Sequence, residues 1–317
     1  MTNPKLLVVG ELNVDLILNK IQAFPQVGKE AIADEMDMCL GSSSAIMAAN
    51  SAAMGVDTTF CGMVGDDYFG DFILGELERK SVNLRHVTKL KGQKTGCTLV
   101  MNFGQDRANV TYQGAMNSLT IIDIPFRSLP VYQHVHVSSL FLQKGILSDI
   151  ERILINARAV GMTTSLDLQW DPSEQWAFDY ARCLPHVDVF MPNESELLAL
   201  TKTDSISSGI EKIRPYLNTL ALKMGKNGSL GICGDQQLTV PAFKGPHFVD
   251  AIGAGDSFNA GFIQKYILGA TLEDCLREGN LMGALNTTAA GGTGAFHDFN
   301  KISENIKDFW GIELCLS

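Results

Sequence analysis

Short apolar runs alternate with helix-length stretches along much of the chain. The first run, 6–9, ends at Gly10 and is followed at wide intervals by six others. These runs are 58–63, 131–137, 163–168, 187–191, 219–223 and 229–233, and helix-length stretches such as 71–80, 148–160 and 194–200 lie between them. Continuous apolar runs of this length are typical of strands buried on both faces. The alternation predicts a three-layer α/β/α fold with a doubly wound, mostly parallel sheet.

Two regions depart from this alternation and predict a second, smaller sheet. Residues 13–20 and 31–40 alternate apolar and polar side chains, and 95–103 with 108–113 are typical of a hairpin turning through 104–106. We predict a single α/β domain over residues 1–317. The small β-sheet would form a lid from approximately residues 12–40 and 94–115, and such lids close on a substrate and exclude water.

Composition and charge narrow the classes of function. The chain has 317 residues, with 25 Lys and Arg against 35 Asp and Glu, a formal net charge of −10. Nucleic-acid-binding domains normally carry a basic footprint instead. No apolar run approaches the roughly 18 residues of a membrane span, and the seven cysteines include no CxxC pair. We therefore expect a cytoplasmic protein that binds neither nucleic acid nor a membrane.

The segment Asp250–Phe258, DAIGAGDSF, carries the strongest chemical signal. Its glycines precede an amphipathic helix, and a turn at a helix N-terminus exposes unpaired amides that form an anion site with the helix dipole. Asp256 in the first turn would lie beside that anion, as a general base requires. A capping residue after an ordinary turn is the alternative. The chain contains no Walker A motif, and no strand–GxGxxG–helix unit supports a dehydrogenase.

The stretch GAGDSFNAGF resembles the C-terminal signature of the ribokinase-like (PfkB) family of carbohydrate kinases. Four further motifs occur in the family's order and extend the resemblance over roughly residues 5–297. They are GELNVD (10–15), GSSSA (41–45) with GMVGDDYFG (62–70), PNESE (192–196) and LKMGKNG (222–228). The resemblance implies an ATP-dependent kinase that uses Mg²⁺ to phosphorylate a hydroxyl of a sugar.

The resemblance also implies roles for individual residues on the nucleotide side. Asp256 would accept the proton of the attacking hydroxyl, and the amides of Gly253, Ala254 and Gly255 would form an anion hole for the γ-phosphoryl group. The implied ATP-binding residues are Asn193, Lys223, Gly225, Gly228 and Asn286. For Asn286, simple packing is the alternative.

Two cation sites follow from the same resemblance. Glu196, with Asn193, would position Mg²⁺ through water, because Mg²⁺ gives up its hydration shell reluctantly. The spacing of Asn193 and Glu196 equally fits a helix capping box. The carbonyls of Asp250 and Ile252, with the turn at 289–295, would offer a site to a monovalent cation such as K⁺, and an ordinary turn is the alternative.

Substrate contacts are expected from three places in the chain. Asn13 and Asp15 project from one strand face, where they suit adjacent sugar hydroxyls or, alternatively, form a solvated strand end. Gly41 to Ser44, Gly41 and Ser42 above all, would bring backbone and hydroxyls close to the sugar, although a serine-capped helix explains them too. Asp167 ends a predicted strand, which is where α/β sheets place ligands.

Four departures from the family pattern bear on the substrate. Ser42 replaces a second glycine, Ile46 replaces an asparagine that contacts the sugar, and Ala251 replaces a threonine. Asp171 stands where relatives that act on acidic or phosphorylated sugars carry an arginine. We therefore predict a neutral sugar, a ketohexose or pentose, as in fructokinases and ribokinases.

Four further expectations concern alternative functions, assembly and metal binding. A nucleoside kinase is the alternative enzyme, with Phe103, Phe141 and Trp170 as candidate pocket aromatics, and a catalytically silent sugar- or nucleotide-binding protein is the alternative of another class. A homodimer through the lid is expected, because lid sheets in this family often form dimers. The pair His134 and His136 could bind a metal, but structural histidines explain it better.

Overall fold

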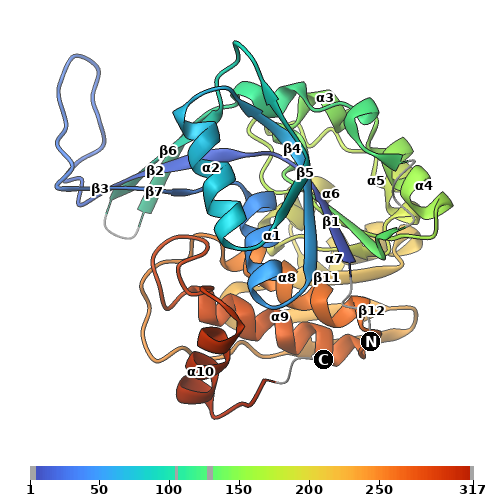
Figure 1. Cartoon of the computed structure of the whole chain (residues 1–317). Coiled ribbons are helices and arrows are strands. Elements are labelled where there is room, and N and C mark those ends of the chain that lie inside the picture. The colour runs from blue at the N-terminus through green and yellow to red at the C-terminus, as the bar shows by residue number, and fades with distance from the viewer. Residues whose placement is uncertain (1–4, 104–105, 127–130, 315–317) are drawn as a thin grey trace.

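The computed structural model describes residues 5–103, 106–126 and 131–314, and its centre is a nine-stranded sheet (Figure 1). Across the sheet the strands are β13 Gln236–Val240, β12 Ser229–Cys233, β11 Thr219–Lys223, β10 Val189–Phe190, β9 Thr163–Asp167, β8 His134–Ser138, β1 Lys5–Val9, β4 Asp57–Gly65 and β5 Asn83–Leu90. All neighbours from β5 to β11 pair in parallel, and β12 and β13 are antiparallel. The predicted mostly parallel sheet is confirmed.

Helices cover both faces of this sheet. One face carries α1 Ser43–Ala53, α2 Tyr68–Arg79, α8 Ala254–Ile267, α9 Leu272–Asn286 and α10 Phe299–Trp310. The other carries α3 Lys144–Leu147, α4 Ile150–Ala159, α5 Tyr180–Cys183, α6 Glu194–Thr201 and α7 Ile206–Ile213. Alternate residues of β1 enter opposite cores, with Leu7 and Val9 in one and Leu6 and Val8 in the other, because successive strand side chains point to opposite faces.

Short 3₁₀ turns complete the described secondary structure. They are η1 Gly114–Ser118, η2 Ile121–Asp123, η4 Leu140–Leu142, η5 Leu184–His186, η6 Arg214–Tyr216 and η7 Gly225–Asn227.

No helix in the described parts of the chain is long and apolar enough to cross a membrane.

The second, smaller sheet is present as predicted, and we call it the lid sheet. Its strands, in spatial order, are β3 Glu35–Leu40, β2 Asn13–Asn19, β6 Gly96–Phe103 and β7 Asp106–Tyr112. The loop from β2 to β3 projects from the body of the molecule in Figure 1. The strand β3 starts at Glu35, four residues after the start of the predicted strand 31–40. Gly104 and Gln105 of the predicted hairpin turn lie outside the described residues.

The order of the strands determines where a ligand can bind. From β1 the chain builds outward through β4 and β5 on one side, and later through β8 to β11 on the other. The carboxyl ends of strands at such a switch point leave a crevice between the diverging connections. Gly10, directly after β1, allows the start of α1 to approach this crevice, because a Cβ atom there would overlap the side chain of Ser44.

The two histidines of β8 have structural partners. His134 Nδ1 lies 2.7 Å from Thr163 Oγ1, and Ser165 Oγ lies 2.7 Å from both His134 Nε2 and His136 Nδ1. Both rings are buried, which lowers the pKa of each and favours neutral imidazole. Among the described residues, no group of three His, Cys, Asp or Glu side chains could hold a metal ion.

Candidate active site

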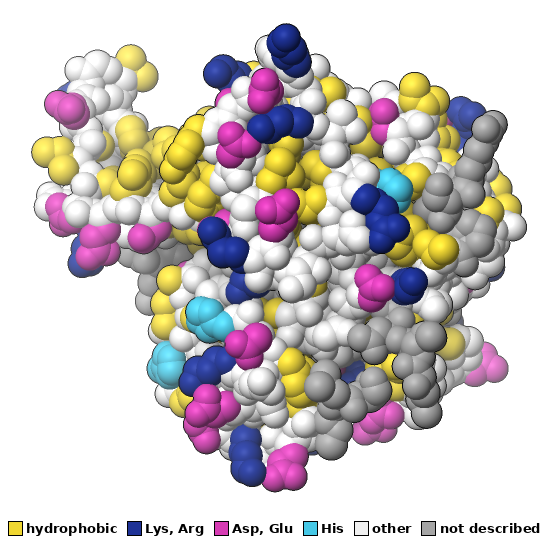
Figure 2. All heavy atoms as spheres, viewed as in Figure 1, with side chains coloured by type: hydrophobic (Ala, Val, Ile, Leu, Met, Phe, Trp, Pro, Cys, Tyr) yellow, Lys and Arg dark blue, Asp and Glu magenta, His cyan; other side chains and the backbone are white. Residues whose placement is uncertain are grey.

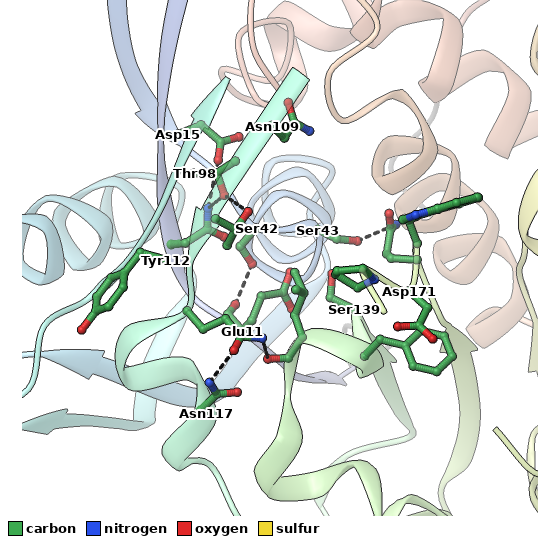
Figure 3. Close-up of a pocket in the computed structure, with 18 of the residues that line it drawn as sticks. Glu11, Asp15, Ser42, Ser43, Thr98, Asn109, Tyr112, Asn117, Ser139 and Asp171 are labelled. Atoms are coloured by element: carbon green, nitrogen blue, oxygen red, sulfur yellow. Dashed lines mark hydrogen bonds between the residues drawn. The ribbon is translucent and has the colours of Figure 1, made fainter. Parts of the chain in front are cut away.

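A cleft of about 1160 Å³ opens between the lid sheet and the carboxyl ends of the central strands (Figure 3). Polar side chains of β2, β6 and β7 form one wall, and Asp256 at the start of α8 lies at the other side. The cleft therefore brings together the lid residues and the GAGD turn, although they lie far apart in the sequence.

Hydrogen bonds organise the lid wall of the cleft. Asn13 Nδ2 donates to Asp15 Oδ1 at 2.9 Å and to Thr98 Oγ1 at 3.0 Å, and Thr98 Oγ1 lies 3.0 Å from Thr111 Oγ1. Burial, together with the negative charge of Asp256, raises the pKa of Asp15 to about 6, against the lowering effect of the hydrogen bond from Asn13. Asn13 and Asp15 both line the cleft, so they share one strand face as the sequence predicts. Their contact with a sugar stays a prediction.

The corner between β3 and α1 lies close against this wall. A Cβ atom at Gly41 would come within 2.7 Å of Asn13 Nδ2 and closer still to the carboxylate of Asp15. Ser42 has a left-handed φ of 70°, and it caps α1 by accepting a hydrogen bond from Ala45 N at 2.9 Å. Its hydroxyl also donates to the Glu11 carbonyl at 2.6 Å. The predicted serine cap is confirmed, and Ser42 lines the cleft as well.

Glu11 is a buried carboxyl group at the cleft that the sequence analysis did not assign. It accepts hydrogen bonds from Ser44 Oγ and, at 3.3 Å, from Ser44 N. Burial raises its pKa to about 7, against the lowering effect of the Ser44 hydroxyl. An acidic residue directly after a glycine-terminated strand was the available signal, because ligands gather at the carboxyl ends of parallel strands.

The turn before α8 has the conformation of an anion site. Gly253 has a left-handed φ of 76°, and a Cβ atom there would lie 2.5 Å from Gly292 Cα. Ala254 N donates to the Ala251 carbonyl at 3.2 Å, whereas the amides of Gly253 and Gly255 donate to no acceptor among the described residues. Two amides at a helix N-terminus are thus free to bind an anion. The amide of Ala254, which we also predicted to take part, has a partner already.

Asp256 lies in the first turn of α8 and is only 7% exposed. Its Oδ1 accepts hydrogen bonds from Ser43 Oγ and, at 3.1 Å, from Gln169 Nε2. Burial raises the pKa of Asp256 to about 6, and the nearby charge of Asp167 adds to this. The two hydrogen bonds and the positive charge of Lys223 oppose the rise. The result is a carboxylate that can take up a proton near neutral pH.

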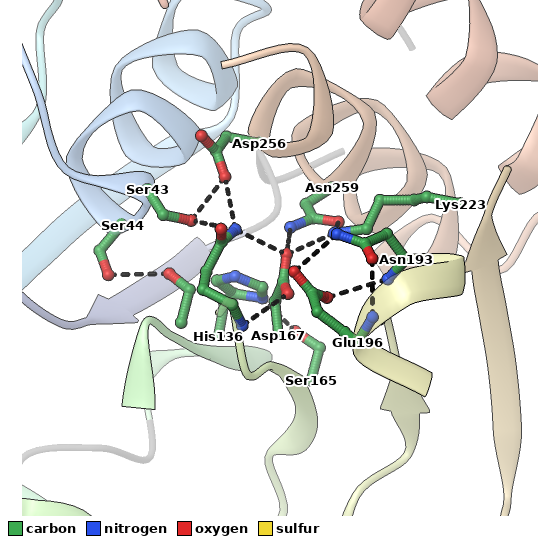
Figure 4. Close-up of polar contacts among 12 residues, drawn as sticks. Ser43, Ser44, His136, Ser165, Asp167, Asn193, Glu196, Lys223, Asp256 and Asn259 are labelled. Carbon is green, nitrogen blue, oxygen red and sulfur yellow. Dashed lines mark hydrogen bonds and ion pairs between the residues drawn. The ribbon is translucent and has the colours of Figure 1, made fainter. Parts of the chain in front are cut away.

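Lys223 and Asp167 form a buried ion pair beneath the anion turn (Figure 4). Lys223 Nζ lies 2.5 Å from Asp167 Oδ2, which also accepts a hydrogen bond from Asn259 Nδ2 at 2.6 Å. A Cβ atom at Gly255 would lie 3.7 Å from Lys223 Nζ, so the ammonium group is adjacent to the turn. The prediction for Asp167 needs correction: its side chain is fully buried and lies outside the cleft lining, so it holds Lys223 rather than facing a sugar.

Asn193 and Glu196 form the capping box of α6. Asn193 Oδ1 accepts from Glu196 N at 2.9 Å, while Glu196 Oε2 and Oε1 accept from Asn193 N at 2.9 Å and Nδ2 at 2.7 Å. Burial raises the pKa of Glu196 to about 7, and the charge of Asp167 adds to this. A carboxylate bonded in this way suits Mg²⁺ held through water rather than by direct ligation. These two residues fit such a role, and that role stays a prediction.

Of the remaining nucleotide-side predictions, one is corrected by the fold. Asn286 is fully buried, and its Nδ2 donates to the Gly292 carbonyl at 2.8 Å, so packing, the alternative, explains it. Gly225 and Gly228 have left-handed φ values of 53° and 90° in the turn after β11. This turn requires glycine at Gly228, because a Cβ atom there would lie 2.6 Å from the backbone nitrogen of Ala242.

Asp250 connects the two segments of the predicted K⁺ site. Its Oδ1 accepts a hydrogen bond from Ile252 N at 2.8 Å, and its Oδ2 accepts one from Gly291 N at 2.9 Å. The carboxylate therefore ties residues 250–252 to the 289–295 turn. This brings backbone from both segments together, as the prediction requires, but assigns no cation.

The structure explains two of the departures from the family pattern. Ile46 packs on the anion turn, because its Cγ2 would lie 3.1 Å from a Cβ atom at Gly253. Asp171 accepts hydrogen bonds from its own loop: from Ser173 N at 2.9 Å, Ser173 Oγ at 2.7 Å and Trp176 N at 2.6 Å. Asp171 thus stabilises the loop. Because its carboxylate is engaged by the loop, the presence of an acid at this position does not support a neutral sugar as the substrate.

Two contacts of the site were not predicted: that of Ser43 with Asp256 and that of Asn259 with Asp167. Ser43 reaches Asp256 across 213 positions of sequence, and no local pattern signals that contact. Asn259 follows Asp256 by three positions on α8, so helical spacing placed the two on neighbouring positions of one face. Of the three candidate aromatics, Phe141 and Trp170 line the cleft, whereas Phe103 packs on Phe24 within the lid.

Comparison with known proteins gives the same assignment as the site. The model of the pfkB family carbohydrate kinases matches residues 3–298. A ribokinase of Bacillus subtilis is 25% identical over 300 residues, which cover 94% of this chain and 97% of that protein. An uncharacterized sugar kinase of Archaeoglobus fulgidus is 28% identical over 233 residues, which cover 73% of this chain and 91% of that protein. The structure of Arabidopsis thaliana ribokinase with ribose and ATP superposes with a TM-score of 0.82 at 23% identity, covering 96% of this chain and 99% of that one. The chain therefore belongs to the pfkB family of carbohydrate kinases and is an ATP-dependent sugar kinase.

Proposed function

We propose that the enzyme transfers the γ-phosphoryl group of ATP to a primary hydroxyl of a neutral ketohexose or pentose, with Asp256 as the general base. The observation that carries this proposal is the convergence on one cleft of a buried carboxylate, two free amides and a hydrogen-bonded polar wall. Phosphoryl transfer depends mainly on positioning and charge stabilisation, which such a site supplies.

In the proposed reaction, Asp256 takes the proton of the sugar hydroxyl while the sugar oxygen bonds to the γ-phosphorus and the bond to ADP breaks. The free amides of Gly253 and Gly255 then face the oxygens over which charge spreads. Lys223 adds positive charge from beneath the same turn. Mg²⁺ bound to the ATP phosphates would neutralise further charge, with Glu196 as a water-mediated ligand.

The charges along the cleft, rather than Asp171, support a neutral sugar. Asp15 and Asp256 both contribute carboxylate groups to the lining. An anionic group on the substrate beside these carboxyls would be repelled, whereas hydroxyl groups can donate to them. Arg107 and Lys144 are exposed in the same cleft, so acidic sugars must be included in the test.

The test is an ATP-consumption screen over neutral sugars, sugar acids, sugar phosphates and nucleosides, followed by Asp256→Asn. We expect turnover of neutral sugars, and a loss of about 10²–10⁴-fold in kcat for the variant, because positioned acid–base groups contribute that much. The matched control is Asp235→Asn, at an exposed aspartate in the β12–β13 turn. Turnover of sugar acids alone would refute the neutral substrate, and an active Asp256→Asn enzyme would refute the base.

A nucleoside is the second candidate substrate, because aromatic side chains line part of the cleft. Trp170 is 49% exposed and packs edge-on against Trp176, with ring centroids 5.1 Å apart, and Phe141 also packs edge-on against Trp176, with centroids 5.5 Å apart. An exposed indole can stack on a base. If nucleosides are substrates, Trp170→Ala should raise their KM about tenfold and leave the KM of a small sugar unchanged.

The outer face of the lid sheet supports a homodimer. One row of apolar side chains crosses all four strands of the lid sheet: Met38, Leu16, Leu99 and Val110. The polar row of Asp15, Thr98 and Thr111 lies on the opposite face, toward the cleft. Apolar side chains gather over this part of the molecule in Figure 2, and Val110 is 61% exposed. Leu16 and Met38 already pack partly against the core, so packing against a second copy would bury mainly the exposed end of the row at Val110. Val110→Glu should convert the protein to monomers in sedimentation experiments, and a monomeric wild type would refute the dimer.

A monovalent cation is proposed at the carbonyls of Asp250 and Ile252. The support is the pair of hydrogen bonds by which the Asp250 carboxylate joins this segment to the 289–295 turn. Because the same segment leads into the anion turn, an ion there would stabilise the turn's conformation. Replacing Na⁺ by K⁺ at constant ionic strength should raise kcat, and equal rates in both salts would refute the site.

A further inference from the structure

The two oxygens of the Asp256 carboxylate have different environments. Oδ1 accepts a hydrogen bond from Ser43 Oγ, which Figure 4 shows, and another from Gln169 Nε2. Oδ2 accepts none from any described residue, although Asp256 lines the cleft. Gln169 Nε2 also lies 2.9 Å from Ser43 Oγ, so the two donors support each other. One oxygen is therefore held in place while the other is available to a ligand.

We infer that Ser43 and Gln169 are positioning residues that hold Asp256 by Oδ1, so that Oδ2 faces the substrate hydroxyl and takes up its proton. This inference rests on the proposed function, in which Asp256 is the base. The O–H bond of the substrate breaks, an Oδ2–H bond forms, and the sugar oxygen replaces ADP on the γ-phosphorus. Ser43 and Gln169 act on this step only through Asp256.

The backbone of Gln169 supports the inference independently. Its φ is 59°, in the left-handed region that residues other than glycine avoid. Such strained conformations persist where the surrounding contacts determine them, and they cluster at functional sites. The contacts here are those of the side-chain amide, which donates to Asp256 and, at 3.2 Å, to Asp167 Oδ2. The strained backbone thus serves to direct this amide at the carboxylate.

The hydrogen bonds to Oδ1 also affect the charge state of Asp256. Both donors favour the carboxylate and lower its pKa, against the burial that raises it to about 6. Removing either donor should therefore raise the pKa of the base further. The other charged groups that act on Asp256, from the elements around it, are Asp15 of β2, Asp167 of β9, Glu196 of α6 and Lys223 of β11.

The decisive comparison is between Gln169→Gly and Glu174→Gly. Glu174 belongs to the same loop, has a left-handed φ of 55°, is exposed and does not line the cleft. Both substitutions relieve the left-handed backbone, which offsets part of the stability lost with the side chain, so both variants should remain folded in urea titrations. Gln169→Gly should lower kcat about 10- to 100-fold, because it removes a charge-assisted hydrogen bond and loosens the base. Glu174→Gly should leave kcat unchanged.

The pH profile separates positioning from a merely structural role. In Gln169→Gly and in Ser43→Ala, the acidic limb of kcat/KM should move to higher pH, while the KM for ATP stays unchanged. Ser43→Ala should retain the fold, because alanine suits the first turn of α1. A wild-type kcat in both variants, or a fall in kcat with the acidic limb unmoved, would overturn the inference.

A combined variant distinguishes this inference from the proposed function. If Asp256→Asn is nearly inactive, adding Ser43→Ala should cause less than a twofold further loss, because no carboxylate remains to be oriented. A large further loss would overturn the positioning role and leave Asp256 as the base. An active Asp256→Asn enzyme would instead overturn the proposed function and with it this inference.

Discussion

Lys223→Met should destabilise the protein, because Lys223 and Asp167 are buried together. Their side chains are 11% and 0% exposed, and Nζ lies 2.5 Å from Oδ2. Removing one partner of a buried pair leaves the other charge uncompensated, at a cost of about 3–5 kcal/mol. Asp167 keeps hydrogen bonds from Asn259 and Gln169, so we expect about 3 kcal/mol, at the lower end.

The assay is urea unfolding of the free enzyme at pH 7.5, with Lys226→Met as the matched control. Lys226 lies three positions along the chain and is exposed, so its replacement should change the free energy of unfolding by less than about 0.5 kcal/mol. Asp167→Asn added to Lys223→Met should recover most of the loss, because a neutral amide needs no counter-charge.

A Lys223→Met variant within 0.5 kcal/mol of wild type at pH 7.5 would refute the importance of the pair.

Three further predictions concern the cleft. Burial raises the pKa of Glu11 from 4.5 to about 7, so the folded state retains a proton that the unfolded chain releases. Stability should then fall as the pH rises from 4.5 to 7, and Glu11→Gln should remove about 3 kcal/mol of that fall in urea titrations at pH 5 and 8. Gly41→Ala should raise the KM for the sugar at least tenfold and leave the KM for ATP unchanged in initial-rate kinetics, since the added Cβ displaces the Asn13–Asp15 pair; equal effects on both would contradict this. Asp171→Ala should cost about 2 kcal/mol in thermal unfolding through its lost loop hydrogen bonds, and any change in the preference between neutral and acidic sugars would contradict its structural role.

Periodicity and short-range motifs predicted most of the architecture. The apolar runs located seven strands of the large sheet, because parallel strands buried on both faces must be apolar throughout. The edge strands β5 and β13 were not recognised, since their burial is partial and their sequences are mixed. Capping was also readable from sequence: Ser42 and the Asn193–Glu196 box act within three residues, where local spacing determines the contact.

The sequence by itself therefore determined the family, the sheet-and-lid organisation and the candidate base, because these depend on local pattern and on motif order. Only the tertiary structure decided what surrounds that base. The ion pair of Asp167 with Lys223, the burial of Asn286 and the contacts of Ser43 and Gln169 with Asp256 join distant segments. The physical reason is that burial and pairing depend on which segments the fold brings together. From the sequence alone, a polar side chain at a given position can equally face a ligand or an internal partner.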